Sequence, residues 1–308
     1  MDDSPSSAFP TEGAASEKEK ERMKRLFEDK SLAQIYRQSR PTVSDAVIDA
    51  VLDYLLAERC STAVTSYVDV ACGHGASSLK FAQKLPSHTT VACVDVSAAQ
   101  VEEAKETFSN DVGTASFHVA DAESLPFEDG SIDLITVMVA FHWMDAAKVL
   151  AEFDRVLKPS GVVAIIGFGE FTFEVDGSSP EQCADIGKAL LDMTRLATPE
   201  DDPAQKARFS MYYGHYRHLH FSYECQRDLW NEDGSLSGRY ERTVGDLFAE
   251  AESWSVVHAY RKAHNGNAPM VDDMRKRIMA DLPPGSTEQT EIVMTVPWFV
   301  RMTRKPAK

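Results

Sequence analysis

Glycines and carboxylates with the spacing of a nucleotide pocket occur in the first half of the 308-residue chain. The run Val68–Gly75 (VDVACGHG) stands where a short apolar segment gives way to a helical pattern. Glycines at such a turn let the backbone approach a ligand closely, because no Cβ is in the way. In an open α/β sheet, ligands bind at the carboxyl ends of the strands. The run therefore predicts a ligand-binding turn.

Two further carboxylates follow at the ends of the next apolar segments. Asp95 stands 22 residues after Gly73, where a carboxylate can accept both hydroxyls of a ribose. Asp121 ends the third segment, and its carboxylate can accept the N6 amino group of adenine. The backbone N–H of the adjacent Ala122 can donate to N1 of the same base. Together these residues predict an adenosine site.

Two cofactors that contain an adenosine, NAD and S-adenosylmethionine, could explain this pattern. The dinucleotide fingerprint G-x-G-x-x-G needs a third glycine, and Ser78 stands at that position. Asp69 lies inside the first segment, where a carboxylate would not help to bind a pyrophosphate. It can instead orient the ammonium of an amino-acid moiety, directly or through water. The residues therefore favour S-adenosylmethionine over NAD.

The segment Ala140–Asp145 (AFHWMD) follows the fourth apolar segment and holds the candidate reactive side chains. Methyl transfer from a sulfonium requires mainly that nucleophile, methyl and sulfur are aligned and that water is kept out. His142 is the candidate base or orienting group. Trp143 is a candidate wall of the methyl site, or faces the sulfonium through its π cloud. Ordinary structural packing remains the alternative for both.

Alternating strand and helix patterns position these residues. Strands are predicted over 66–70, 90–95, 115–120, 132–139 and 162–167, and helices over 44–56, 77–85, 97–108 and 145–157. Such alternation requires a parallel sheet covered on both faces. The predicted fold is α/β, a doubly wound, mostly parallel, seven-stranded sheet.

The rest of the chain divides by composition. Residues 1–22 are predicted to be a disordered tail, and residues 23–169 the N-terminal helices and the cofactor-binding half of the domain. Residues 170–240 are aromatic and polar and break the alternation, which predicts an inserted cap between the fifth and sixth strands that sets substrate choice. Residues 241–308 are expected to add a helix over 244–262 and a closing strand pair, 291–296 and 298–303.

The predicted cap departs from the acidic character of the chain, whose formal net charge is −16. Residues 205–220 hold Lys206, Arg208, Arg217 and three histidines, and no Asp or Glu. A local positive patch can receive an anionic substrate that an acidic protein otherwise repels. Arg208 and Arg217 are therefore the candidate substrate-binding residues, and a solvated basic loop is the alternative. Nothing beside the histidines supports a metal site, so no metal is predicted.

Composition also restricts partners and location. The net charge disfavours nucleic acid and anionic membrane surfaces, and favours a monomer or a weak homodimer. The five cysteines include no C-x-x-C pair, which fits a reducing compartment. The chain shows neither a signal peptide nor an apolar run of the ~20 residues that a membrane span needs. A cytoplasmic location is expected.

The chain resembles class I S-adenosylmethionine-dependent methyltransferases of the type 11 group, and within it the small-molecule branch of trans-aconitate methyltransferase-like proteins. The matching pieces span residues 27–306 and include YRQSRP (36–41), VDVACGHG (68–75), CVDVS (93–97), VADAESLPFEDGSIDLI (119–135), AFHWMD (140–145) and LKPSGVV (157–163). Residues 243–260 and 300–306 also resemble that branch. One departure is Ala71-Cys72, where the wider class often has glycine.

The resemblance implies methyl transfer to a small-molecule acceptor, with a carboxylate or another oxygen nucleophile favoured. The alternatives are N-, C- or S-methyl transfer, or a non-catalytic S-adenosylmethionine-binding protein. The candidate catalytic residues are His142, Trp143 and Tyr36, the last resembling a lid residue of the family. The candidate cofactor-binding residues are Asp69, Ala71, Gly73, Gly75, Asp95, Val96, Asp121 and Ala122.

Overall fold

A computed structural model describes residues 28, 40–57, 63–109, 115–198 and 203–307. The helices are α3 (Asp45–Leu56), α4 (Ala76–Lys84), α5 (Ala98–Phe108), the 3₁₀ helix η1 (Phe141–Trp143), α6 (Ala146–Val156), α7 (Pro180–Ala197), α8 (Pro203–Tyr213), α9 (Val244–Ser253), α10 (Ser255–Ala263) and α11 (Pro269–Asp281). The strands are β1 (Ser66–Val70), β2 (Thr90–Asp95), β3 (Ala115–Val119), β4 (Ile132–Met138), β5 (Leu157–Phe168), β6 (Thr172–Glu174), β7 (Gln226–Leu229), β8 (Gly238–Thr243), β9 (Glu291–Val296) and β10 (Trp298–Arg304). The predictions for residues 1–22 and for Tyr36 lie outside the described residues.

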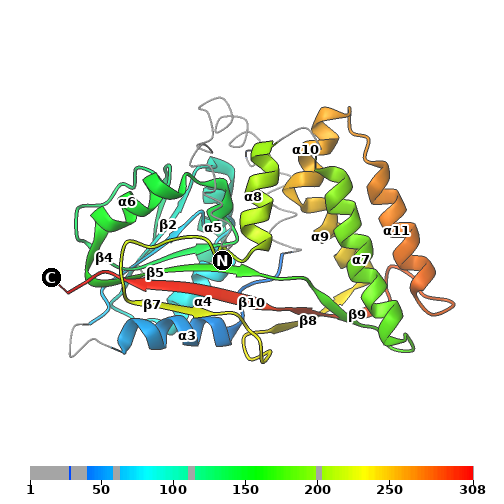
Figure 1. Ribbon diagram of the computed structural model, residues 1–308, viewed down its shortest axis with the longest axis horizontal. Coiled ribbons are helices and arrows are strands. Elements are labelled where there is room, and N and C mark those ends of the chain that lie inside the picture. Colours follow the sequence, from blue (N-terminus) through cyan, green and yellow to red (C-terminus); the bar gives the residue numbers. More distant parts are fainter. Residues whose placement is uncertain (1–27, 29–39, 58–62, 110–114, 199–202, 308) are drawn as a thin grey trace, which may run out of the picture.

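A seven-stranded sheet forms the centre of the molecule, in the order β3-β2-β1-β4-β5-β10-β7 (Figure 1). The strands β1 to β5 pair in parallel, and β10 runs antiparallel to both of its neighbours. Helix α3 lies on one face of the sheet and α6 on the other (Figure 1). The predicted doubly wound, mostly parallel, seven-stranded fold is confirmed.

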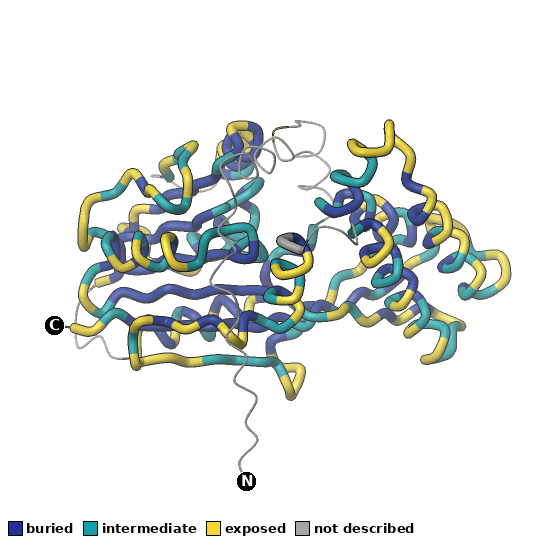
Figure 2. Tube along the Cα trace, turned by 45° about the horizontal axis from the view of Figure 1, so that its top comes forward, coloured by how far each residue is buried: buried dark blue, intermediate teal, exposed yellow. Residues whose placement is uncertain are grey.

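Alternation along the central strands explains why both faces are covered. In β4, Leu134 packs into the core beneath α3 and α4, whereas Ile135 packs into the core beneath α6. Successive side chains of a strand point to opposite faces, so a strand that is apolar throughout needs a helix layer on each side. Figure 2 shows this arrangement as buried central strands beneath helices whose outer sides are exposed.

Side-chain caps fix where two of the covering helices begin, as the sequence predicts. The Ser97 hydroxyl accepts a hydrogen bond from the Gln100 N–H (3.3 Å) at the start of α5. The Asp145 carboxylate accepts one from the Lys148 N–H (3.3 Å) at the start of α6. Each cap satisfies a backbone donor that has no partner inside its helix.

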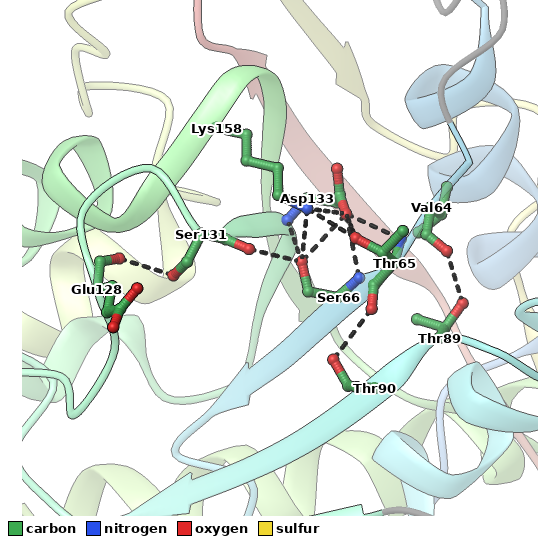
Figure 3. A network of polar contacts seen from close by, with 9 residues as sticks. All are labelled: Val64, Thr65, Ser66, Thr89, Thr90, Glu128, Ser131, Asp133 and Lys158. Carbon is green, nitrogen blue, oxygen red and sulfur yellow. Dashed lines mark hydrogen bonds and ion pairs between the residues drawn. The ribbon is translucent and has the colours of Figure 1, made fainter.

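A buried carboxylate joins the strands at the amino end of the sheet (Figure 3). Asp133 is 3% exposed, and its Oδ2 accepts from Thr65 N (2.9 Å), Ser66 N (3.0 Å) and Lys158 Nζ (2.8 Å). These bonds connect β4 to the start of β1 and to β5. Since ligands bind at the opposite, carboxyl edge, this network serves stability.

A second layer extends beyond the carboxyl edge of the sheet. It contains a three-stranded antiparallel sheet, β6-β9-β8, with α7, α9, α10 and α11 (Figure 1). This layer differs from the predicted cap of residues 170–240. It extends to β9, and β7, inside the predicted cap, is instead the edge strand of the central sheet.

The predicted C-terminal elements also differ from the structure. The helix expected over 244–262 is two helices, α9 and α10, which meet at Trp254 in extended conformation. The Ser253 hydroxyl donates to the Glu250 carbonyl (2.6 Å), a bond that competes with helix continuation. Helix α11 was not predicted. Strands β9 and β10 do not pair with each other but belong to different sheets, separated by Pro297, which has no N–H to continue a ladder.

In the described part of the chain, none of the helices is both long and apolar enough to cross a membrane.

Candidate active site

The turn between β1 and α4 is built from backbone in the left-handed region. Ala71 (φ 56°), Gly73 (φ 54°) and Gly75 (φ 79°) all adopt positive φ. A Cβ on Gly75 would lie 3.1 Å from the Ala104 Cβ, so glycine lets α4 begin directly against α5. Ala71 lacks this freedom, and its conformation costs about 1–2 kcal/mol. The departure from glycine noted in the sequence therefore stores strain beside the ligand site.

Asp95 ends β2 beside this turn and is 7% exposed. Its Oδ2 accepts from Gly73 N (3.0 Å) and its Oδ1 from Ser97 N (2.9 Å). Burial raises the pKa of Asp95, although hydrogen bonds from backbone N–H groups act against the rise. A carboxylate has about four acceptor positions, so these backbone bonds leave room for a ribose hydroxyl. Val96, the next residue, lines the same cavity.

Asp69 is fully buried within β1 and is held by side chains from two other elements. Its carboxylate accepts from the Thr136 hydroxyl (2.8 Å) and from the Ser78 hydroxyl. The Tyr67 hydroxyl bonds Thr136 in turn (2.9 Å). Burial raises the pKa of Asp69 to about 7, against these hydrogen bonds. Ser78, which stands where a dinucleotide fingerprint has glycine, thus binds the carboxylate that distinguishes this pocket.

The predicted adenine site follows β3 at the same edge of the sheet. The Asp121 carboxylate is exposed and accepts from Glu123 N (2.9 Å), and both Asp121 and Ala122 line the cavity. Gln100 lies opposite on α5, is 3% exposed and also lines the cavity. Its Oε1 has no hydrogen-bond partner among the described residues. The sequence marked Gln100 only as a capping residue, so this acceptor was missed.

His142 lies in η1, just after β4, and is 5% exposed. Its Nδ1 and the Tyr216 hydroxyl are 2.8 Å apart, and its ring packs 4.7 Å from the Tyr212 ring, between centroids. Burial, together with the nearby charge of Arg208, lowers the pKa of His142 to about 3. The imidazole is therefore neutral near pH 7 and a weak base. This environment suits an orienting group better than a strong general base.

The structure separates the two candidate arginines. The Arg208 guanidinium, on α8, lies 5.8 Å from the ring centroid of Trp143, close to His142. Arg217 is exposed, and its guanidinium lies 4.4 Å from the ring centroid of Trp230. Of the described cations, Arg40 and Lys188 line the cavity, and neither Arg208 nor Arg217 does. Arg40 was not selected from the sequence, although it lies in the YRQSRP piece.

A single cavity of about 980 Å³ connects these groups. Its lining includes Gly73, Asp95 and Asp121. His142, Trp143 and aromatic side chains of the central sheet, of α8 and of the second layer line it as well. The aromatic lining residues are Phe168, Phe171, Phe173, Phe209, Tyr212, Tyr213, Trp254 and Trp298. This volume is at the upper end of ligand pockets, which suits two molecules better than one. Among the described residues no cluster of His, Cys, Asp and Glu could hold a metal ion.

Comparison with known proteins identifies the part of the chain that holds the glycine turn and most of the parallel strands. Residues 68–165 match the methyltransferase domain family. The chain therefore contains a class I methyltransferase domain. A solved structure from Anaeromyxobacter dehalogenans, described as a type II methyltransferase, superposes with a TM-score of 0.61 at 22% identity. It covers 87% of this chain and 99% of its own, so the likeness in fold extends beyond the methyltransferase domain.

Curated relatives match parts of this chain. Malonyl-acyl-carrier-protein O-methyltransferase of Geobacter sulfurreducens is 33% identical over 133 residues, 43% of this chain and 48% of the relative. The ubiquinone/menaquinone biosynthesis C-methyltransferase of Francisella philomiragia is 36% identical over 106 residues, 33% of this chain and 42% of the relative. The chain thus matches less than half the length of these two relatives. They do not specify the trans-aconitate methyltransferase-like branch, which stays a prediction.

Proposed function

We propose that the chain transfers a methyl group from S-adenosylmethionine to an oxygen nucleophile of a small molecule. The observation that carries this proposal is the single cavity, which joins the adenosine edge to an aromatic acceptor chamber past His142 and Trp143. The chain is an enzyme, and its cofactor is S-adenosylmethionine. The pocket suits this cofactor because Asp95 can still accept a hydrogen bond from ribose. The buried Gln100 Oε1, which has no partner among the described residues, can accept one from the cofactor as well.

When bound, the cofactor supplies a methyl group on a sulfonium, which leaves as a neutral thioether. The chain's own residues bind and orient. Asp95 and Asp121 hold the adenosine, and the glycine turn admits the amino-acid end. Trp143 and the aromatic cap exclude water, which strengthens every electrostatic interaction in the site.

The acceptor proposed is a carboxylate or another oxygen that arrives ionised. Such an acceptor needs no proton removed, and this suits a site whose histidine has its pKa lowered to about 3. Arg208 lies beside Trp143 but outside the cavity lining, and its positive charge supports an anionic acceptor through attraction at a distance. The relatives act on both oxygen and carbon, so transfer to carbon is the second candidate. A cytoplasmic location and a monomer or weak homodimer are further proposals from composition.

The test uses the purified chain, isotope-labelled S-adenosylmethionine and a metabolite extract. We expect S-adenosylhomocysteine to form and the label to appear, by mass spectrometry, in a small anionic molecule as a methyl ester or ether. The Asp95→Ala variant is the control and should label less than the wild type at a subsaturating concentration of S-adenosylmethionine. Label found on carbon or nitrogen would refute the oxygen acceptor, and calorimetric binding of NAD in place of S-adenosylmethionine would refute the cofactor.

A further inference from the structure

The turn that follows α8 holds a side chain in contact with His142. His215 (φ 55°) and Tyr216 (φ 54°) are consecutive residues in the left-handed region, and neither is glycine. Such a conformation costs free energy and persists only where the surroundings enforce it. Two backbone hydrogen bonds tie the turn to the end of α8, from His215 N to Tyr212 O (2.8 Å) and from Tyr216 N to Met211 O (2.9 Å). The carbonyl groups of the turn need a separate donor.

Arg301 supplies that support from β10 and is 4% exposed. Its Nη1 donates to the carbonyl oxygens of Leu219 (2.9 Å) and Tyr216. Its Nε and Nη2 donate to the two carboxylate oxygens of Asp228, on β7, at 3.1 and 3.0 Å. A two-point pair of this kind fixes a guanidinium in one orientation. Strand β10 and its neighbour β7, the edge strand of the central sheet (Figure 1), thereby hold the strained turn in place.

Tyr216 connects this turn to the cavity. It is 1% exposed, and its hydroxyl lies 2.8 Å from Nδ1 of His142, which lines the cavity. This hydroxyl can donate its proton to Nδ1. A neutral imidazole has one donor and one acceptor nitrogen, so an imidazole that accepts at Nδ1 carries its proton on Nε2.

We propose that Arg301, fixed by Asp228, is a positioning residue for the reaction: through Tyr216 it sets the orientation and the Nε2–H tautomer of His142. This inference rests on the proposed function, in which His142 orients the reactants at the methyl site. The inference gives β10 a role in positioning His142, in addition to its role in the central sheet. Arg301 acts through two other side chains and is not itself a catalytic residue.

The test compares three variants in the full-length chain with bound S-adenosylhomocysteine. Tyr216→Phe removes the hydroxyl, and Arg301→Lys keeps the charge but loses the two-point pair. Arg304→Lys is the matched control, because Arg304 is equally buried on β10 but donates to the carbonyls of Tyr54, Leu55 and Ser160, away from the turn. The readout is the pair of nitrogen-15 chemical shifts of the His142 ring, assigned with a His142→Gln variant.

We expect the wild type and Arg304→Lys to show the Nε2–H tautomer, and the other two variants a mixture. Their kcat should fall by about 10- to 100-fold, as expected for a misplaced reacting group, with unchanged affinity for S-adenosylhomocysteine. The proposal would be overturned if the His142 tautomer were unchanged in Tyr216→Phe. It would also be overturned if Arg301→Lys lowered the melting temperature without changing the His142 chemical shifts. The chemical shifts need no turnover, so a wild type that transfers no methyl group would refute the proposed function alone.

Discussion

Glu250 is the most unusual acidic group among the described residues outside the cavity. It lies on α9, is 1% exposed, and its Oε1 has no hydrogen-bond partner in the described chain. Burial raises its pKa from 4.5 to about 7, although the charges of Arg40 and Arg242 act in the opposite direction. Between these two pH values the folded chain keeps a proton that the unfolded chain has released. Glu250 therefore weakens the folded state progressively as the pH rises from about 4.5 to 7.

The magnitude follows from the difference between the two pKa values, 7 − 4.5, or about 2.5 units. Each unit corresponds to about 1.4 kcal/mol, so full ionisation costs about 3 kcal/mol. The Glu250→Gln variant cannot ionise. We expect the free energy of unfolding of the wild type, relative to this variant, to fall by about 2–3 kcal/mol between pH 5 and pH 8. Denaturant titration at several pH values measures this difference.

Glu252, two residues further along α9, is the matched control. Burial raises its pKa, but hydrogen bonds from Arg261 and Arg275 outweigh that effect, so the pKa is lowered below 4.5. Its contribution to stability is complete above pH 4.5 and is lost only as the pH falls below that value. Glu252→Gln should therefore differ from the wild type by a constant amount between pH 5 and pH 8. If Glu250→Gln showed the same constant difference, the reasoning from burial would be refuted.

Four further outcomes are expected. Asp95→Ala should weaken S-adenosylhomocysteine binding by about 1.5–3 kcal/mol in titration calorimetry, and an unchanged affinity would contradict its ribose role. Gly75→Ala should destabilise the fold by about 1–2 kcal/mol because of its positive φ, with an unchanged melting temperature as the contrary result. Asp133→Asn should cost about 3 kcal/mol in denaturant unfolding while cofactor affinity stays the same; a loss of affinity instead would place Asp133 in the site. Arg208→Glu should raise the KM of an anionic acceptor about 10-fold or more, whereas Arg217→Glu should leave it near the wild-type value; equal effects would contradict the positions described above.

The central sheet could be predicted because its signals are local. Strands β1 and β2 have the same bounds in the sequence prediction and in the structure, 66–70 and 90–95. Each is a short apolar run followed by a turn or a helix cap, and these features lie within a few neighbouring residues. The glycine turn between β1 and α4, where cofactor binding is proposed, is equally local, since its glycines and Asp95 meet through the parallel pairing of β1 with β2.

The boundaries of the second layer could not be predicted because the strand that decides them, β7, has no periodic apolar pattern. Strand β7 is the sequence QRDL, with three polar residues out of four, and composition alone assigned it to the cap. Its membership of the central sheet depends on pairing with β10, more than 70 residues later, as in Arg301 with Asp228. Aromatic residues of 170–240 do line the cavity, but Trp254, Ser255, Val256 and Trp298, from later in the chain, complete its lining.

The roles of charged residues were the hardest to predict, and α9 shows the physical reason. Glu250 and Glu252 are the same residue type on one helix, and two positions on an α-helix differ in direction by roughly 200°. One side chain therefore enters the core beneath the cap, where desolvation raises its pKa, and the other faces Arg261 and Arg275. The sequence contains no local feature that distinguishes them, since burial is decided by the helices packed against α9. The same holds for His142, whose neutral state depends on burial and on the charge of Arg208, 66 residues away. A motif can thus indicate which side chains reach a cavity, but their protonation is set by distant parts of the chain, and this is why the pH comparison of the two α9 variants tests the fold itself.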